Sequence, residues 1–232
     1  MKKIFLLFCL IAVIASTSCE EDELKLPAEV NIAFDMISFD LDDNTKGEPV
    51  FTVDEGYIVI NTIEFDGERD EGEDYFFSSP FEEPLQAELH TGYMTQDVSF
   101  DVPQGVYYKV EFNFIVGDEE YPALRLRGIS NDPVLGDIPV LFEYPFVEEI
   151  QIEATNINGK KEIVLRKDRP STATIILDIP FLCKLFNPGM IQQAELVSIE
   201  GEDVLLINNE TNTNIFNIMA IRLEKSMQVV FE

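Results

Sequence analysis

The residue types that most often carry catalysis are scarce in this chain. It has a single histidine, His90, and neither a Gly-x-Ser-x-Gly sequence nor a phosphate-binding P-loop. His90 follows a strand-like pattern and precedes Gly92, which predicts a solvent-facing position in a turn rather than a helical pair with Met94. One histidine without a cysteine partner cannot form the usual zinc ligand sets. The sequence therefore predicts no catalytic residue, no metal ligand and no enzyme.

Acidic segments are the most distinctive chemical feature of the sequence. Asp66–Asp74 holds six acids in nine residues, and Asp40–Gly47 partly resembles a calcium loop. The second segment fails the EF-hand template, which needs glycine where Thr45 stands and glutamate where Phe51 stands. We interpret both segments, together with Asp118–Glu120, as solvated surface loops. Calcium binding at extracellular, millimolar concentrations is the alternative, and no other cofactor is expected.

Paired carboxylates leave one catalytic alternative open. Any two of the 44 acidic residues could face each other across a glycosidic bond. The chain has no tryptophan, the side chain on which sugars commonly stack, so a carboxylate-based glycan hydrolase is the less favoured hypothesis.

The amino-terminal segment predicts export and removal of a leader. Lys2 and Lys3 precede an unbroken apolar run, Ile4–Ala15. A helix of that length covers roughly 18 Å, well short of the ~30 Å hydrocarbon core of a bilayer. We therefore interpret residues 1–18 as a signal peptide.

The residues around Cys19 resemble those of a known class of envelope protein. Ser16-Thr17-Ser18-Cys19 resembles a bacterial lipobox, although leucine is usual where Ser16 stands, and the acidic run Glu20–Glu23 resembles the export tag of Bacteroidota surface lipoproteins. The resemblance implies lipidation at Cys19 and an outward-facing location on the outer membrane. It also implies contact with the membrane through the lipid alone.

Cysteine usage fits the same interpretation. Cys9 lies in the leader and Cys19 would carry lipid, so Cys183 is left alone in the mature chain and no internal disulfide can form. Cys183 stands in the apolar stretch Phe181–Phe186, where we expect it to be a packed hydrophobic side chain.

Net charge excludes one class of partner. The formal charge is −28, and loss of Lys2 and Lys3 with the leader would take it to −30. A surface this acidic repels phosphate backbones, so nucleic-acid binding is excluded. The partner we expect is a protein or a glycan.

Most of the mature chain shows the alternation of β-strands. Val98, Phe100 and Val102 alternate with polar residues, and so do Val106, Tyr108 and later residues up to Val116. Pro103-Gln104-Gly105 lies between the two runs, so we predict a β-hairpin over residues 95–116. Asn158-Gly159 predicts a second hairpin turn.

The carboxyl-terminal region has a different pattern. A helical turn is expected at Phe181–Phe186 and an amphipathic helix over 215–223, capped by Thr211 or Thr213. Residues 190–208 fit a helix or a hairpin, with Gly201-Glu202 favouring the hairpin, and Met227–Phe231 fits a returning strand.

About ten short strands separated by turn residues predict a mainly β protein. We expect an antiparallel β-sandwich, immunoglobulin- or transthyretin-like, over residues 28–180, with a small α/β extension over 181–232 packed on it. Residues 19–27 would be the lipidated cysteine and an acidic tether. The VPQGVYYKVEF segment is similar to one found in small lipid-anchored β-sandwich proteins of Bacteroidota, which supports the fold alone. The alternative is two β domains that meet near Gly128–Gly136.

These features favour a non-catalytic, lipid-anchored cell-envelope protein that binds a partner or supports an assembly. A calcium-stabilised adhesion or glycan-binding module is the first alternative, and the glycan hydrolase is the second.

Overall fold

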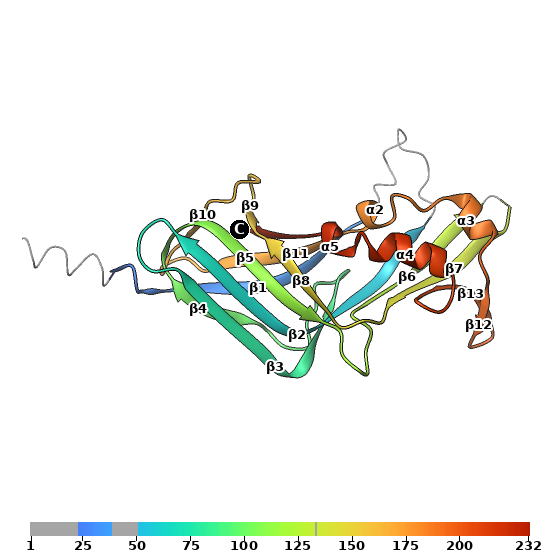
Figure 1. The fold of residues 1–232 in the computed structure, drawn as a ribbon, viewed down its shortest axis with the longest axis horizontal. Helices are drawn as coiled ribbons and strands as arrows, with labels where there is room; N and C mark the ends of the chain where they lie inside the picture. The colour runs from blue at the N-terminus through green and yellow to red at the C-terminus, as the bar shows by residue number, and fades with distance from the viewer. Residues whose placement is uncertain (1–22, 39–50, 133) are drawn as a thin grey trace, which may run out of the picture.

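The structure, a computed structural model, describes residues 23–38, 51–132 and 134–232. The predicted signal peptide, Cys19 and the segment Asp40–Gly47 lie outside these ranges. The described chain is mainly β, with two packed sheets and four short helices along one side (Figure 1). The prediction of a mainly β fold is confirmed.

The smaller sheet has five strands in the order β4-β1-β11-β14-β9. Their bounds are β1 Pro27–Ile37, β4 Ser99–Pro103, β9 Thr155–Asn156, β11 Ser171–Asp178 and β14 Met227–Phe231.

The larger sheet has nine strands, of which seven follow the order β10-β5-β2-β6-β7-β13-β12. The other two pair at its sides, β3 with β2 and β8 with β5. The bounds are β2 Thr52–Arg69, β3 Tyr75–Glu88, β5 Gly105–Val116, β6 Leu124–Asp132, β7 Gly136–Tyr144, β8 Glu148–Glu153, β10 Ile163–Leu165, β12 Val197–Ile199 and β13 Glu202–Ile207.

Short helices connect the carboxyl-terminal strands. Asp178 and Asn187 begin the first two by accepting backbone N–H bonds through their side chains. The third has three buried side chains, Ile215, Phe216 and Met219. The bounds are α2 Ile179–Leu182, α3 Pro188–Gln192, α4 Thr213–Ala220 and α5 Leu223–Ser226.

The core lies between the two sheets and is rich in aromatic rings. Phe65 of β2 is fully buried, and its ring packs edge-on against Phe100 of β4 at 5.8 Å and against Phe112 of β5 at 5.6 Å. Phe112 also contacts Phe231 of β14 at 6.0 Å between ring centres. These contacts join the larger sheet to the smaller one through the hydrophobic effect and ring geometry.

Strand pairing is mixed rather than antiparallel throughout. β1 pairs with β11, β13 with β7, and β14 with β9, all in parallel. Parallel partners need long connections, which join segments distant in the sequence. Alternation cannot predict this, because it identifies the buried face of a strand and not the direction of its neighbour.

The predicted hairpin over residues 95–116 is wrong. β4 pairs with β1 in the smaller sheet, whereas β5 pairs with β2, β8 and β10 in the larger one. Pro103-Gln104-Gly105 is therefore a corner at which the chain changes sheets. Gly105 has φ +155°, and a Cβ added there would stand 3.1 Å from the Arg69 guanidinium.

The predicted face of β5 is wrong at its start. Tyr107 is fully buried and Tyr108 is 50% exposed, which reverses the expected alternation. The register explains the reversal, because Glu68 pairs with Lys109 and Arg69 with Tyr107, leaving Tyr108 as the extra residue of a β-bulge. From Val110 onward the predicted alternation is confirmed.

Three strands of the predicted carboxyl-terminal extension, β12, β13 and β14, are members of the two sheets. β13 pairs with β7 in the larger sheet, and β14 lies between β11 and β9 in the smaller one. The β12–β13 hairpin, helix α4 and the last strand confirm the local predictions, although Asn212 precedes the helix in place of a threonine cap. Gly128–Gly136, the alternative domain boundary, lies inside the β6–β7 hairpin.

Candidate functional site

The structure places the two side chains that are the strongest sequence candidates for acid–base or nucleophilic chemistry, His90 and Cys183, in opposite surroundings. His90 is exposed in the turn after β3, as predicted. Cys183 is 5% exposed, and burial raises the pKa of its thiol to about 12. It is therefore a neutral thiol at physiological pH, which confirms that it is a packed hydrophobic side chain.

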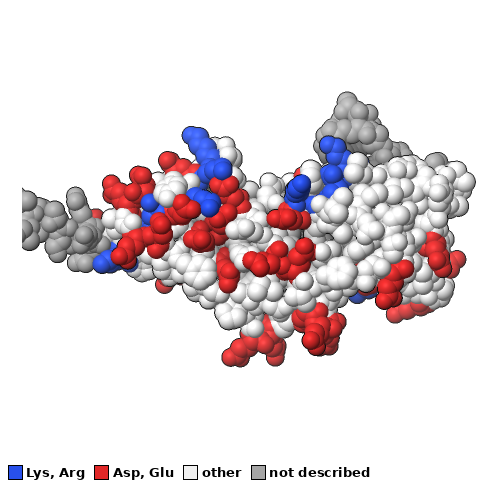
Figure 2. All heavy atoms as spheres, viewed as in Figure 1, with Lys and Arg blue, Asp and Glu red and all other residues white. Residues whose placement is uncertain are grey.

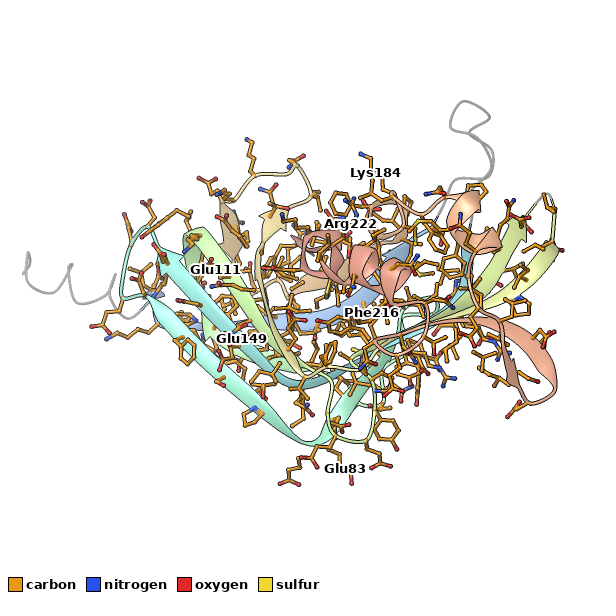
Figure 3. All side chains as sticks on the ribbon, turned by 45° about the vertical axis from the view of Figure 1, so that its right-hand side comes forward. Glu83, Glu111, Glu149, Lys184, Phe216 and Arg222 are labelled. Atoms are coloured by element: carbon orange, nitrogen blue, oxygen red, sulfur yellow. The ribbon has the colours of Figure 1, made fainter. Side chains whose placement is uncertain are left out.

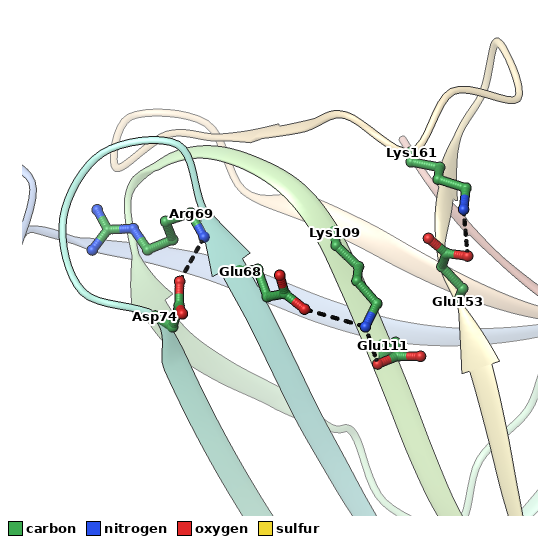
Figure 4. A network of polar contacts seen from close by, with 7 residues as sticks. All are labelled: Glu68, Arg69, Asp74, Lys109, Glu111, Glu153 and Lys161. Atoms are coloured by element: carbon green, nitrogen blue, oxygen red, sulfur yellow. Dashed lines mark hydrogen bonds and ion pairs between the residues drawn. The ribbon is translucent and has the colours of Figure 1, made fainter.

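The acidic segment Asp66–Asp74 is organised around Arg69 rather than around an open loop. Its first residues belong to β2, and only residues 70–74 form the tip between β2 and β3. Arg69 is 7% exposed, and its guanidinium lies 5.7 Å from the centre of the Tyr107 ring. The backbone N–H of Arg69 donates to Asp74 Oδ1 at 3.0 Å, which holds the tip closed (Figure 4).

The Arg69 guanidinium donates to backbone carbonyl oxygens from three separate segments. Nη2 donates to the oxygens of Leu24 and Gln104 at 2.7 Å each, and Nη1 donates to the oxygen of Glu73 at 3.3 Å. Arg69 thus joins the amino-terminal tether, the β4–β5 corner and the β2–β3 tip at one end of the molecule.

Gln104 completes this attachment of the tether. Its side-chain amide donates to the carbonyl oxygen of Glu23 at 2.7 Å, and its backbone N–H donates to that of Leu26 at 2.8 Å. The first described residues are therefore fixed to the body of the protein. We call Glu23–Leu26, Arg69 and Gln104 the tether clamp.

Charged side chains form an ordered array on the outer face of the larger sheet. Lys109 Nζ lies 2.7 Å from Glu111 and 3.2 Å from Glu68, and these two carboxylates raise the pKa of the lysine (Figure 4). Tyr108 donates to Glu68 and, with Lys109, lowers the pKa of that carboxyl. On β8, Glu153 pairs with Lys161 at 2.8 Å.

The glycan-hydrolase alternative needs two carboxylates that face each other in a cleft. One pair, Glu64 and Glu149, lies close together but not in a cleft. Asn113 Nδ2 donates to Glu64 at 3.2 Å and to Glu149 at 2.7 Å, so the two acids share one amide nitrogen. They come from β2 and β8 and stand on an open sheet face, where acidic side chains gather over β2, β5 and β8 (Figures 2 and 3). Nothing in this arrangement encloses a sugar or excludes water from the pair.

The carboxylate pair of Glu64 and Glu149 does not line the cavity found between the sheets, and the described residues contain no group that could bind a metal ion. A small cavity between the sheets is lined entirely by apolar side chains, among them Phe34, Ile58 and Leu223. Across residues 23–38, 51–132 and 134–232, no three His, Cys, Asp or Glu side chains are grouped so that they could hold a metal ion. Within the same ranges, no helix is both long and apolar enough to span a bilayer.

Sequence reasoning missed Arg69, Gln104 and Asn113. The sequence does single out Arg69, because it is the only basic residue among the acids of Asp66–Asp74. It does not single out Gln104 and Asn113, since their partners come from segments 81 and 36 residues away.

Comparison of the chain with protein-family models, with curated proteins and with solved structures gives no match.

Proposed function

We propose that this chain is a non-catalytic lipoprotein of the cell envelope, anchored through Cys19 on the outer face of the outer membrane, where it binds a protein or glycan partner or supports an assembly. The observation that supports the proposal best is the tether clamp. A lipid on Cys19 would be followed by only a few residues before Glu23 is fixed to the body of the protein. The anchor would therefore hold the folded domain by one defined end.

The position of the clamp adds to this support. Residues 23–26 lie at the same end as the β2–β3 tip and the β4–β5 corner, and the β6–β7 and β12–β13 hairpins lie at the opposite end (Figure 1). An anchored domain would thus present its sheet faces and far hairpins away from the bilayer. Such a rigid scaffold suits a binding module whose contacts come from exposed strands and loops.

We also infer that the two packed sheets form a β-sandwich of the immunoglobulin- or transthyretin-like class. Rings from both sheets interdigitate around Phe65, as in sandwich cores. The parallel β1–β11 pair is a departure from the antiparallel sheets that are usual in the immunoglobulin fold.

The anchor is tested by fractionating cells that express the full chain or its Cys19→Ala variant. We expect the unchanged chain in the outer-membrane fraction and accessible to protease added to intact cells. The Cys19→Ala variant should become soluble. A variant that still sediments with membranes would refute lipidation at Cys19, and a membrane-bound chain that added protease cannot reach would refute outward display.

A further inference from the structure

One segment of the larger sheet has a backbone edge that no described strand covers. On one side, residues Tyr75–Pro80 of β3 pair with β2, where Tyr75 lies opposite Gly67 and Pro80 opposite Thr62. They pair with no other strand of the described chain. The last part of β3 differs, because Thr95 N–H donates to Gln86 and Glu88 N–H donates to Tyr93. The free edge of β3 opposite its pairing with β2 is therefore Tyr75–Pro80.

This edge is held in place by packing on its inner side. Phe77 stacks on Phe100 of β4 with 4.8 Å between ring centres, and Tyr75 lies 6.4 Å from Phe65. The Tyr75 hydroxyl also donates to the Asp101 carbonyl oxygen at 3.3 Å. The backbone is thus fixed in strand geometry before any partner arrives, which lowers the entropy lost on binding.

The charge pattern along the edge is unusual for so acidic a protein. Residues 75–81 carry no charge, whereas four acids precede them in the β2–β3 tip and Glu82-Glu83 follows them. The second acidic pair lies where four β3 residues bulge out between Pro80 and Leu85, and Glu83 stands at the bend of the strand (Figure 3). The free edge is an uncharged strip with acids at both ends.

A second copy of this chain does not fit the strip. Two-fold antiparallel pairing of β3 with β3 would set the acids of residues 70–74 against Glu82-Glu83 of the other copy, and like charges repel. The strip has few features that would prevent another strand from pairing with it. Pro80 removes one N–H donor at its end, whereas Tyr75–Ser79 contains neither proline nor charge. Phe76 is 61% exposed in the middle of the strip.

We propose that residues Tyr75–Ser79 of the free edge accept an extended segment of a partner protein as an added strand, and that this segment has a short uncharged centre with lysine or arginine at both ends. Backbone hydrogen bonds to the edge would supply affinity, and Phe76 would pack against an apolar side chain of the segment. The terminal cations would lie near the acids at each end of the strip and set its position along β3. This interaction goes beyond the proposed function and does not depend on the lipid anchor.

The test uses purified full-length protein and a fluorescein-labelled peptide with two lysines on each side of a Thr-Val-Thr-Val-Thr centre. Binding is followed by fluorescence anisotropy, and hydrogen exchange of the protein is compared with and without peptide. We expect saturable binding with added amide protection within Tyr75–Ser79. The affinity should fall about tenfold in the Glu82→Lys, Glu83→Lys double variant, because the attraction between these two acids and the lysines of the peptide becomes repulsion. It should fall at least as far in Phe76→Lys, which places a cation in the strip.

Matched controls separate strand addition from general attraction between opposite charges. Glu202→Lys with Asp203→Lys reverses two adjacent exposed acids at the far hairpin and should leave the affinity within about twofold. The peptide with N-methyl groups on alternate central amides keeps its charge and cannot add as a strand, so it should bind much more weakly. Equal binding of the N-methylated peptide, equal loss in the two charge-reversed variants, or self-association of the protein through Tyr75–Ser79 would each overturn the proposal.

Discussion

Arg69 is a buried cation whose side-chain hydrogen bonds go to backbone carbonyl oxygens. It is 7% exposed, and no ion pair joins its guanidinium to a carboxylate among the described residues. Carbonyl dipoles from Leu24, Glu73 and Gln104 take the place of water around the charge. Losing the cation would leave these carbonyls unsatisfied, so this residue holds three chain segments together.

Replacing Arg69 with methionine should therefore cost stability at the tether end. We expect Arg69→Met to lower the free energy of unfolding by about 3 kcal/mol, measured by urea denaturation, because hydrogen bonds to a charged donor are lost together. Trypsin should also cleave after Lys25 faster in the folded variant, since Leu24 loses its contact with the body of the protein. Arg127→Met, which removes an exposed arginine of β6, should change stability by less than about 0.5 kcal/mol. Equal effects of the two substitutions would contradict the clamp.

At the scale of elements, the sequence predicts which face of a strand is buried better than it predicts which strand pairs with it. Leu85, Ala87 and Leu89 alternate in the sequence and are all buried in the structure. The same alternation before and after Pro103 predicts a hairpin, yet the two strands belong to different sheets. Alternation records burial of one face, whereas pairing depends on contacts between distant segments, which a single sequence does not contain.

The bulge in β5 is a second case in which local pattern is insufficient. Tyr107 and Tyr108 are adjacent and chemically alike, and one is buried while the other is exposed. Tyr107 donates to the Pro103 carbonyl oxygen at 2.6 Å and lies beside Arg69, and burial raises its pKa to about 12. The corner and the clamp therefore select which tyrosine turns inward. For the candidate site, the sequence predicts the acidic character of the face and not the clamp that orients it.

The close approach of β6 to β2 requires a glycine at position 128. A Cβ added at Gly128 would stand 1.8 Å from the Thr52 carbonyl oxygen, near the register shift between Val53 and Glu55. Backbone on both strands would have to move to admit a methyl group.

We therefore expect Gly128→Ala to lower the free energy of unfolding by about 3 kcal/mol, at the upper end of the cost of overpacking, when measured by urea denaturation. Gly189→Ala is a suitable control, because the nearest atom to its added Cβ is the Asn187 side-chain oxygen at 3.3 Å. That variant should stay within about 0.5 kcal/mol of the unchanged protein. If Gly128→Ala were equally mild, the two strands would not approach as closely as described.

At the scale of the whole molecule, net charge opposes the compact state. The chain carries a formal charge of −28, and acids gather over the half that holds β2, β5 and β8 (Figure 2). Among the described residues, only a few of these charges have a cation in ion-pair distance, as Lys109 provides for Glu68 and Glu111. Screening by any salt should therefore stabilise the fold, without a bound ion.

Calcium distinguishes this general screening from a specific site. In the segment Asp66–Asp74, Asp74 already accepts the Arg69 N–H, and Glu68 is held by Lys109 and Tyr108, so a bound cation would have to compete with these contacts. We expect millimolar calcium to raise the melting temperature no more than sodium chloride at equal ionic strength, with EDTA as the baseline. A further rise of several degrees specific to calcium would contradict the interpretation of the acids as solvated surface. Asp70→Asn and Asp40→Asn variants would then locate the ion, because a site at the tip would lose the rise in the first variant and a site in Asp40–Gly47 would lose it in the second.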